Sequence, residues 1–115
     1  MRRDEQRLAD ILEAIAKIEG VAARGRAAFE QDEMIQVWII HYIQILGEAA
    51  RSLSSSLRER HQQVPWALVV GMRNILVHDY FGIDLDEVWS VVERDLPILR
   101  DQIEAILEQE NQGNP

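Results

Sequence analysis

The chain has 115 residues, enough for one domain with a single modest core. It carries 12 basic and 20 acidic side chains, and a formal charge of −8 argues against nonspecific coating of nucleic acid, which requires many neutralised phosphates. It has no Cys, which excludes disulfides, thiolate nucleophiles and Cys-ligated metal sites. Any chemistry on nucleic acid must therefore use a local cationic spot.

The sequence also lacks the features of a targeted or membrane-spanning chain. The first ten residues, MRRDEQRLAD, mix acids with bases and contain no apolar stretch typical of a signal peptide. The longest apolar runs, residues 37–40 and 67–72, are far shorter than a membrane span. We expect a soluble, cytoplasmic protein with no membrane partner.

Apolar residues recur at helical spacing in nearly every segment. The first helix is predicted over residues 4–18, with Gly20 ending it, and it carries the apolar stripe Leu8, Ile11, Leu12, Ile15 and Ile18. Residues 21–32 are predicted to be a connection that could add one turn. A second helix is predicted from about residue 32 to about residue 53, and residues 57–61 could add a short one.

Pro65 suits the first position of a further helix, over residues 66–77, which has no ordinary charged face. Its expected core side holds Leu68, Val69, Met72, Ile75 and Leu76. The opposite side carries a stripe of small and polar residues, Ala67, Gly71, Asn74 and His78. Small residues let another backbone approach closely, and a helix that is apolar on two sides is buried on two sides. We therefore predict a twofold homodimer with this helix near the axis.

The last helix is predicted to begin at a capping box and to contain a proline. Asp84 followed by Glu87 is the pattern of such a box, and Pro97 should kink the helix near the residue that precedes it. Residues 111–115 are expected to form a frayed polar tail. The sequence thus predicts an all-α antiparallel bundle of four main helices plus a short one, in a single domain over residues 1–110.

The densest group of chemically active residues lies in the segment MRNILVHDYFGID, which contains Arg73, Asn74, His78 and Tyr80. His is the usual proton carrier near neutral pH, and Arg offers a fork that matches phosphate oxygens. On a helical wheel Arg73 and His78 lie about 140° apart, so one helix does not present them together. Two such helices meeting at an axis would place two Arg and two His around one cleft.

This motif and its flanks resemble the HEPN superfamily, and within it the HepT-like toxins that are paired with a minimal nucleotidyltransferase. The matching segments are LGEAARSLS, VPWALVVGMRNILVHDYFGID and VWSVVERDLPILRDQI. The resemblance implies a dimeric, metal-independent endoribonuclease without a cofactor, in which Arg73 and His78 are catalytic and Asn74 supports them. It also implies that the partner nucleotidyltransferase, as antitoxin, transfers AMP to Tyr80 and silences the cleavage of RNA.

Less specific interpretations stay open beside this one. Arg73 could be a solvated cation favoured by the helix dipole, and His78 could cap backbone carbonyls at the helix end. The whole chain could be a noncatalytic dimeric scaffold that binds a nucleotidyltransferase or a nucleotide, an alternative that the charge of −8 favours. The chain could also be the regulator, with its partner as the toxin.

Other conspicuous side chains are predicted to be structural. His41 is expected to be packed and hydrogen-bonded, His61 to be exposed, and the acids of the first and last helices to lie on solvated faces. The three tryptophans are expected to anchor the core or an interface: Trp38, Trp66 and Trp89. No His has a Glu three residues before it, which excludes the di-iron site of some helical bundles.

Overall fold

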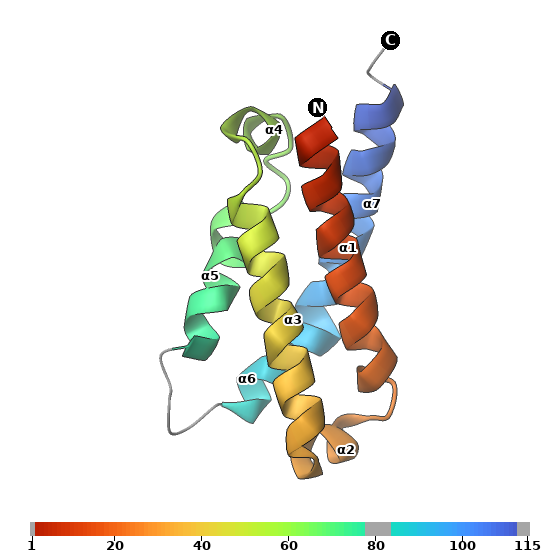
Figure 1. Cartoon of the computed structure of the whole chain (residues 1–115), viewed down its shortest axis with the longest axis vertical. Coiled ribbons are helices and arrows are strands. Elements are labelled where there is room, and N and C mark those ends of the chain that lie inside the picture. Colours follow the sequence, from red (N-terminus) through yellow and green to blue (C-terminus); the bar gives the residue numbers. More distant parts are fainter. Residues whose placement is uncertain (1, 78–83, 113–115) are drawn as a thin grey trace.

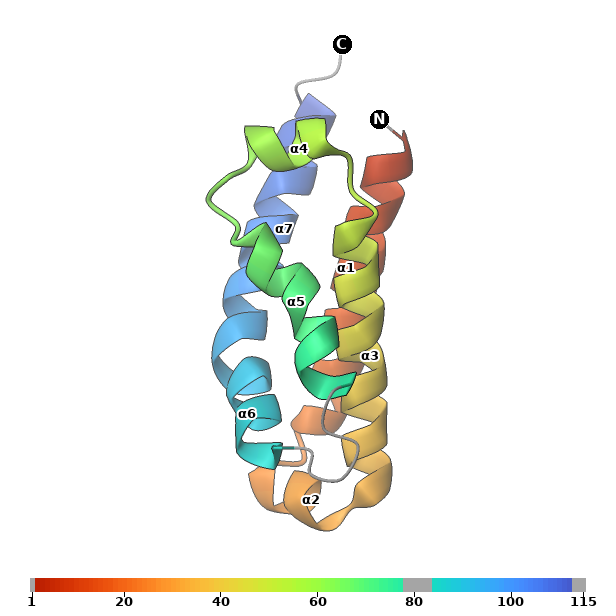
Figure 2. The same cartoon turned by 90° about the vertical axis from the view of Figure 1, so that its left-hand side faces the viewer.

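A computed structural model describes residues 2–77 and 84–112, and the regular structure within these ranges is helical (Figure 1). The elements are α1 (Arg2–Ala22), α2 (Arg26–Gln31), α3 (Glu33–Arg51), α4 (Ser55–Arg60), α5 (Trp66–Val77), α6 (Leu85–Ser90), the π-helical segment η1 (Val91–Asp95) and α7 (Leu96–Gln112). Helices α1 and α3 and the run from α6 to α7 follow the long axis of the molecule, and α5 packs on α3 (Figures 1 and 2). The predicted all-α bundle is confirmed.

The core fills the space between α1, α3 and α7. Each of these helices contributes side chains with no exposed surface, such as Ile11, Ile39 and Ile103. Burying a side chain of this size contributes about 1.5–3 kcal/mol relative to leaving it in water. Four of the five predicted apolar residues of α1 are buried and Leu12 is partly buried, as the helical spacing predicted. Among the described helices, none has both the length and the apolar content needed to cross a bilayer.

The turn after α1 lies later than predicted. Gly20 does not end the helix, which continues to Ala22. A helical Gly costs only about 1 kcal/mol relative to Ala, and the packing of Val21 and Ala22 against the core offsets that cost. The chain turns instead at Gly25, whose φ of 96° is readily adopted by glycine. The extra turn that follows is helix α2, which buries Phe29.

Two predicted features of the later helices have counterparts in the structure. The side chain of Asp84 accepts a hydrogen bond from the Glu87 N–H at the start of α6. Before Pro97, the irregularity takes the form of the π-helical segment η1, in which the Leu96 N–H donates to the Val91 carbonyl five residues earlier. A proline donates no hydrogen bond and its ring crowds the carbonyl four residues back, which favours this wider local winding.

Over residues 66–73, where its side chains are described, helix α5 buries a narrower face than its sequence suggests; the side chains of Ile75 and Leu76 lie outside the described part. Val69 and Met72 are buried as predicted, together with Trp66. Leu68, expected in the core, has 52% of its surface exposed. The reason is that α5 packs chiefly on α3, which leaves Leu68 over a groove of about 140 Å³ that it lines together with Ile98 of α7.

The polar cluster at the end of the molecule that carries α4 was not predicted. His61, expected to be exposed, has 5% of its surface exposed, and its Nε2 lies 2.8 Å from Oε2 of Glu110 on α7. Arg60 donates to the other oxygen of Glu110 at 2.8 Å, and the indole of Trp66 donates to the His61 carbonyl at 2.9 Å. Asp4 of α1, which was expected on a solvated face, is likewise buried, with 3% of its surface exposed. The cluster ties α4 and the start of α5 to the last turns of α7.

Acidification is expected to weaken this cluster. Hydrogen bonds from Arg60 and His61 lower the pKa of Glu110 below its ordinary value of 4.5. A carboxyl whose pKa is lower in the folded state contributes stability that is complete above the ordinary pKa and is lost as the pH falls through the folded value. The free energy of unfolding should therefore fall more steeply below about pH 4.5 in the wild type than in Glu110→Gln. Urea denaturation between pH 3 and pH 7 measures both slopes, and parallel curves would contradict the prediction.

Two other aromatic side chains are exposed: His41, contrary to the prediction, and Trp38, which is therefore no core anchor and stays a predicted interface anchor. His41 is exposed on α3 rather than packed, and its ring forms a T-shaped pair with the ring of Tyr42, with centroids 5.0 Å apart. Trp38 has 40% of its surface exposed, and its indole donates to the Lys17 carbonyl at 2.9 Å. Trp66 and Trp89 are buried, as predicted for core anchors.

Candidate active site around Arg73

The structure describes the side chain of one of the four predicted site residues. Arg73 lies on α5, in the half of the helix that precedes the motif histidine. Asn74 is the next helical residue of α5, but its side chain lies outside the part of the chain that is described. His78 and Tyr80 lie outside the described residues altogether.

Arg73 stands where α5 packs tightly on α3. Gly47 of α3 is buried there, and a Cβ added to it would lie 3.1 Å from the Arg73 Cβ and 3.4 Å from the Val69 carbonyl oxygen. Contacts this short are tighter than nearly all real Cβ contacts, so a larger residue at position 47 would push the two helices apart. The glycine therefore sets the distance between α3 and the base of the Arg73 side chain.

The guanidinium of Arg73 is ion-paired with a carboxylate of α3. Its Nη1 donates to Oε2 of Glu48, and the two side chains are 35% and 52% exposed. The other oxygen of Glu48 lies 3.5 Å from Nη1 of Arg51, whose side chain is 59% exposed. Two arginines thus share one carboxylate, so these three side chains together carry a net charge of +1 on an otherwise acidic chain. This is a local cationic spot of the kind that phosphate chemistry on this chain requires.

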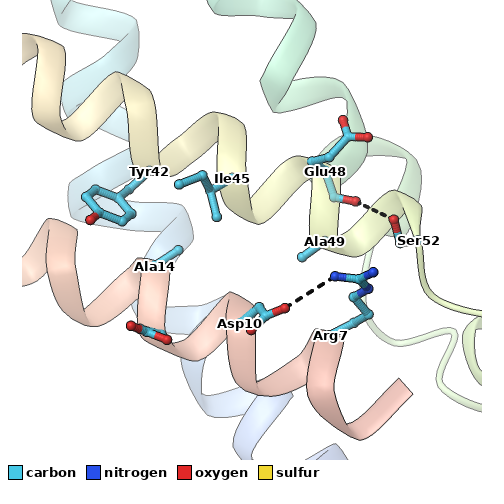
Figure 3. Close-up of a pocket in the computed structure, with 9 residues that line it drawn as sticks. Arg7, Asp10, Ala14, Tyr42, Ile45, Glu48, Ala49 and Ser52 are labelled. Carbon is cyan, nitrogen blue, oxygen red and sulfur yellow. Dashed lines mark hydrogen bonds and ion pairs between the residues drawn. The ribbon is translucent and has the colours of Figure 1, made fainter. Parts of the chain in front are cut away.

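A pocket of about 550 Å³ lies beside this site, between α1 and α3 (Figure 3). Arg7 and Asp10 of α1 form an ion pair in it at 3.5 Å. Tyr42 and Glu48 of α3 line it, together with Ser52, which follows that helix. Figure 3 shows the Glu48 carboxylate pointing away from Arg7 and Asp10. Since acids outnumber bases in the lining, the pocket is poorly suited to a phosphate, and Arg73 does not line it.

The first two residues of the predicted small-residue stripe lie on the side of α5 that faces solvent. Ala67 is exposed, and Gly71 is partly exposed with no atom within 4 Å of an added Cβ. The first two members of the stripe therefore leave room for another backbone. The Asn74 side chain and His78, which complete the stripe, lie outside the described residues.

The residues described by the structure offer one kind of chemistry. No three His, Asp or Glu side chains among them gather closely enough to hold a metal ion. A partly exposed guanidinium at a fixed position can instead bind two oxygens of a phosphate through parallel N–H donors. Sequence reasoning found Arg73 but missed Gly47 and Glu48, which lie in the segment LGEAARSLS and carry no spacing signal that links them to Arg73.

Comparison with known proteins agrees with the motif. The family described as "Ribonuclease HepT-like" matches residues 11–106. The "Putative RNase MJ1380" of Methanocaldococcus jannaschii is 40% identical over 78 residues, which cover 68% of this chain and 72% of that protein. The "Probable ribonuclease HepT" of Thermococcus cleftensis is 32% identical over 108 residues, covering 91% of this chain and 96% of that protein. No solved structure matches the chain. The chain therefore belongs to the HepT-like ribonuclease family of the HEPN superfamily.

Proposed function

We propose that the chain is the toxin of a toxin–antitoxin pair, an endoribonuclease that cleaves RNA in the cytoplasm without a metal ion. The observation that carries the proposal is Arg73, whose base is held where α5 packs on α3 and whose side chain is 35% exposed, in a chain of the HepT-like ribonuclease family. A fixed, accessible arginine is what recognition of a phosphodiester requires.

The proposed reaction uses one residue set from each of two copies. One His78 takes the proton from the 2′-hydroxyl of RNA, whose oxygen attacks the adjacent phosphorus and forms a 2′,3′-cyclic phosphate. The bond from phosphorus to the 5′-oxygen breaks, and the second His78, as the imidazolium, protonates that leaving oxygen. Arg73 binds the phosphate oxygens and stabilises the charge that develops on them, and Asn74 supports the pair. The open side of α5 at Ala67 and Gly71 supports a homodimer that builds this cleft.

A purified sample of the full chain tests this proposal. In EDTA it should cleave an RNA oligonucleotide and leave a DNA oligonucleotide of the same sequence intact, because the attacking 2′-hydroxyl is absent from DNA. Mass spectrometry of the products should show a cyclic phosphate. A sample that leaves RNA intact at every concentration at which it is dimeric would refute the proposal.

Tyr80 is the proposed acceptor of AMP from a minimal nucleotidyltransferase antitoxin. Transfer forms a bond between the phenol oxygen and the α-phosphorus of ATP and releases pyrophosphate. The added AMP would block the cleft by bulk and by repulsion of the RNA phosphate. Tyr80→Phe should therefore keep its ribonuclease activity, gain no AMP mass and resist neutralisation when incubated with the partner enzyme and ATP. Full modification and neutralisation of Tyr80→Phe would contradict this role.

A noncatalytic dimeric scaffold that binds the nucleotidyltransferase or a nucleotide is the second candidate. The net charge of −8 favours it, because long-range attraction of RNA to such a chain is poor. The scaffold predicts stable binding of the partner with no cleavage of RNA in the assay above.

A further inference from the structure

We propose that Glu48 is a positioning residue, which holds the guanidinium of Arg73 so that one edge of it is presented to a phosphate of the substrate. This inference rests on the proposed ribonuclease function and adds a residue of α3 to its site. Glu48 acts through Arg73 and is not itself expected to touch the reacting atoms.

The contact between the two side chains engages one edge of the guanidinium. Nη1 of Arg73 donates to Glu48, so the Nε–Nη2 edge of the same fork is not engaged by this carboxylate. That edge carries two parallel N–H donors, the arrangement that binds two oxygens of a phosphate. A single carboxylate can therefore orient Arg73 without occupying the donors that the substrate needs.

Both ends of this arrangement are fixed by the packing of α3 and α5. The base of the Arg73 side chain lies against Gly47, next to Glu48 in the sequence. The second oxygen of Glu48 lies 3.5 Å from Arg51, one turn further along α3. The carboxylate is thus held between two arginines, and an arginine fixed at its base and at one nitrogen loses less freedom when a phosphate binds.

The same carboxylate has an electrostatic cost. The Glu48 carboxylate lies on the other side of the Arg73 guanidinium from the proposed phosphate, and the two negative charges repel each other. Because the Glu48 side chain is 52% exposed, water and salt screen this repulsion. Removing the charge should strengthen RNA binding about two- to fivefold, while removing the hydrogen bond to Arg73 should slow the chemical step. The two effects act on different kinetic constants, and a merely structural role for Glu48 predicts neither.

Steady-state kinetics with a short RNA in EDTA separates these effects. Glu48→Gln keeps an oxygen that accepts from Arg73, so its kcat should stay within about threefold of the wild type while its KM falls about two- to fivefold. Glu48→Ala loses the contact, so its kcat should fall about 10- to 100-fold without a rise in KM. The matched control is Glu19→Ala, which removes the partner of Arg100 between α1 and α7, a 2.6 Å ion pair of similar exposure, and should change neither constant.

The outcomes distinguish this inference from the function on which it rests. If the wild type cleaves RNA and Glu48→Ala has an unchanged kcat, the positioning role is wrong and the ribonuclease function stands. If the wild type does not cleave RNA, the proposed function is wrong, and binding of an uncleavable 2′-O-methyl RNA decides the role of Glu48. The predicted role is supported if, relative to the wild type, Glu48→Gln binds this RNA about two- to fivefold more tightly and Arg73→Ala binds it more weakly. Equal affinities of the three proteins overturn it.

Discussion

Replacing Arg73 or His78 with Ala is expected to reduce kcat/KM for RNA cleavage by about 10²–10⁴-fold while leaving the fold intact. For His78 the loss is that of a general acid or base, and for Arg73 it is that of a donor aimed at developing phosphate charge. Arg73 contributes little to stability, because its ion pair with Glu48 is largely exposed and such pairs contribute about 0–1 kcal/mol. Cleavage rates of purified variants, with circular dichroism as the check on folding, measure both effects.

Matched variants make this prediction specific to the site. Arg100→Ala removes an arginine of similar exposure that is ion-paired with Glu19, and His41→Ala removes an exposed histidine of α3. Both should cleave RNA at the wild-type rate. Arg73→Lys should lie between the wild type and Arg73→Ala, because lysine keeps the charge but lacks the planar fork. A wild-type rate for Arg73→Ala would show that this arginine is only the solvated helix residue of the less specific interpretation.

Replacing Phe29 with Ala is expected to cost about 3–5 kcal/mol of the free energy of unfolding, the largest stability effect that we predict. The side chain is 1% exposed, and its ring packs against Trp89 with centroids 5.3 Å apart. This contact joins α2 to α6, and Phe29 is the buried residue of α2, whereas α6 buries Val88 as well as Trp89. Truncation would leave a cavity between them, and a domain of this size has only about 5–15 kcal/mol in total.

Urea denaturation of three variants measures this contribution. Phe29→Leu should recover most of the loss because it refills the space with apolar volume. Met34→Ala, which removes a side chain that is 81% exposed, should change stability by less than about 0.5 kcal/mol. A loss for Phe29→Ala as small as that for Met34→Ala would mean that α2 does not depend on this packing.

The fold was predictable where periodicity and capping are local signals. The apolar spacing of α1 and the Asp84 cap of α6 depend on neighbours within a few residues, and both are found in the structure. Phe29 was missed because its segment is too short for a periodic pattern, and α2 became a helix through a tertiary contact with Trp89. Leu68 was misplaced because a wheel gives the apolar side of a helix but not which neighbour covers it.

The exposure of polar residues was harder to predict, because it depends on partners far away in the sequence. His61 is buried because Glu110, 49 positions later, accepts its hydrogen bond. Asp4 is buried because the backbone N–H and hydroxyl of Ser54 donate to its carboxylate at 3.0 and 2.7 Å. A lone histidine or aspartate in a sequence carries no trace of such a partner.

In the candidate site, too, the sequence indicated the motif residue but not its partners from distant parts of the chain. The motif located Arg73 by composition and family resemblance, without any knowledge of its surroundings. Its partner Glu48 lies 25 positions earlier, on a helix that meets α5 only in the folded chain, and Gly47 matters only because the two helices pack there. The roles of all four motif residues, Arg73, Asn74, His78 and Tyr80, stand as predictions.

The central claim is that two copies of the chain share one cleft, and paired heterodimers test it most directly. One heterodimer joins a wild-type subunit to a subunit carrying both Arg73→Ala and His78→Ala, and the other joins an Arg73→Ala subunit to a His78→Ala subunit. In a shared cleft both hold one Arg and one His, so we predict equal rates within about twofold, each below the rate of the wild-type dimer. A first heterodimer with half the wild-type activity beside an inactive second would place a complete site in each subunit and contradict the claim.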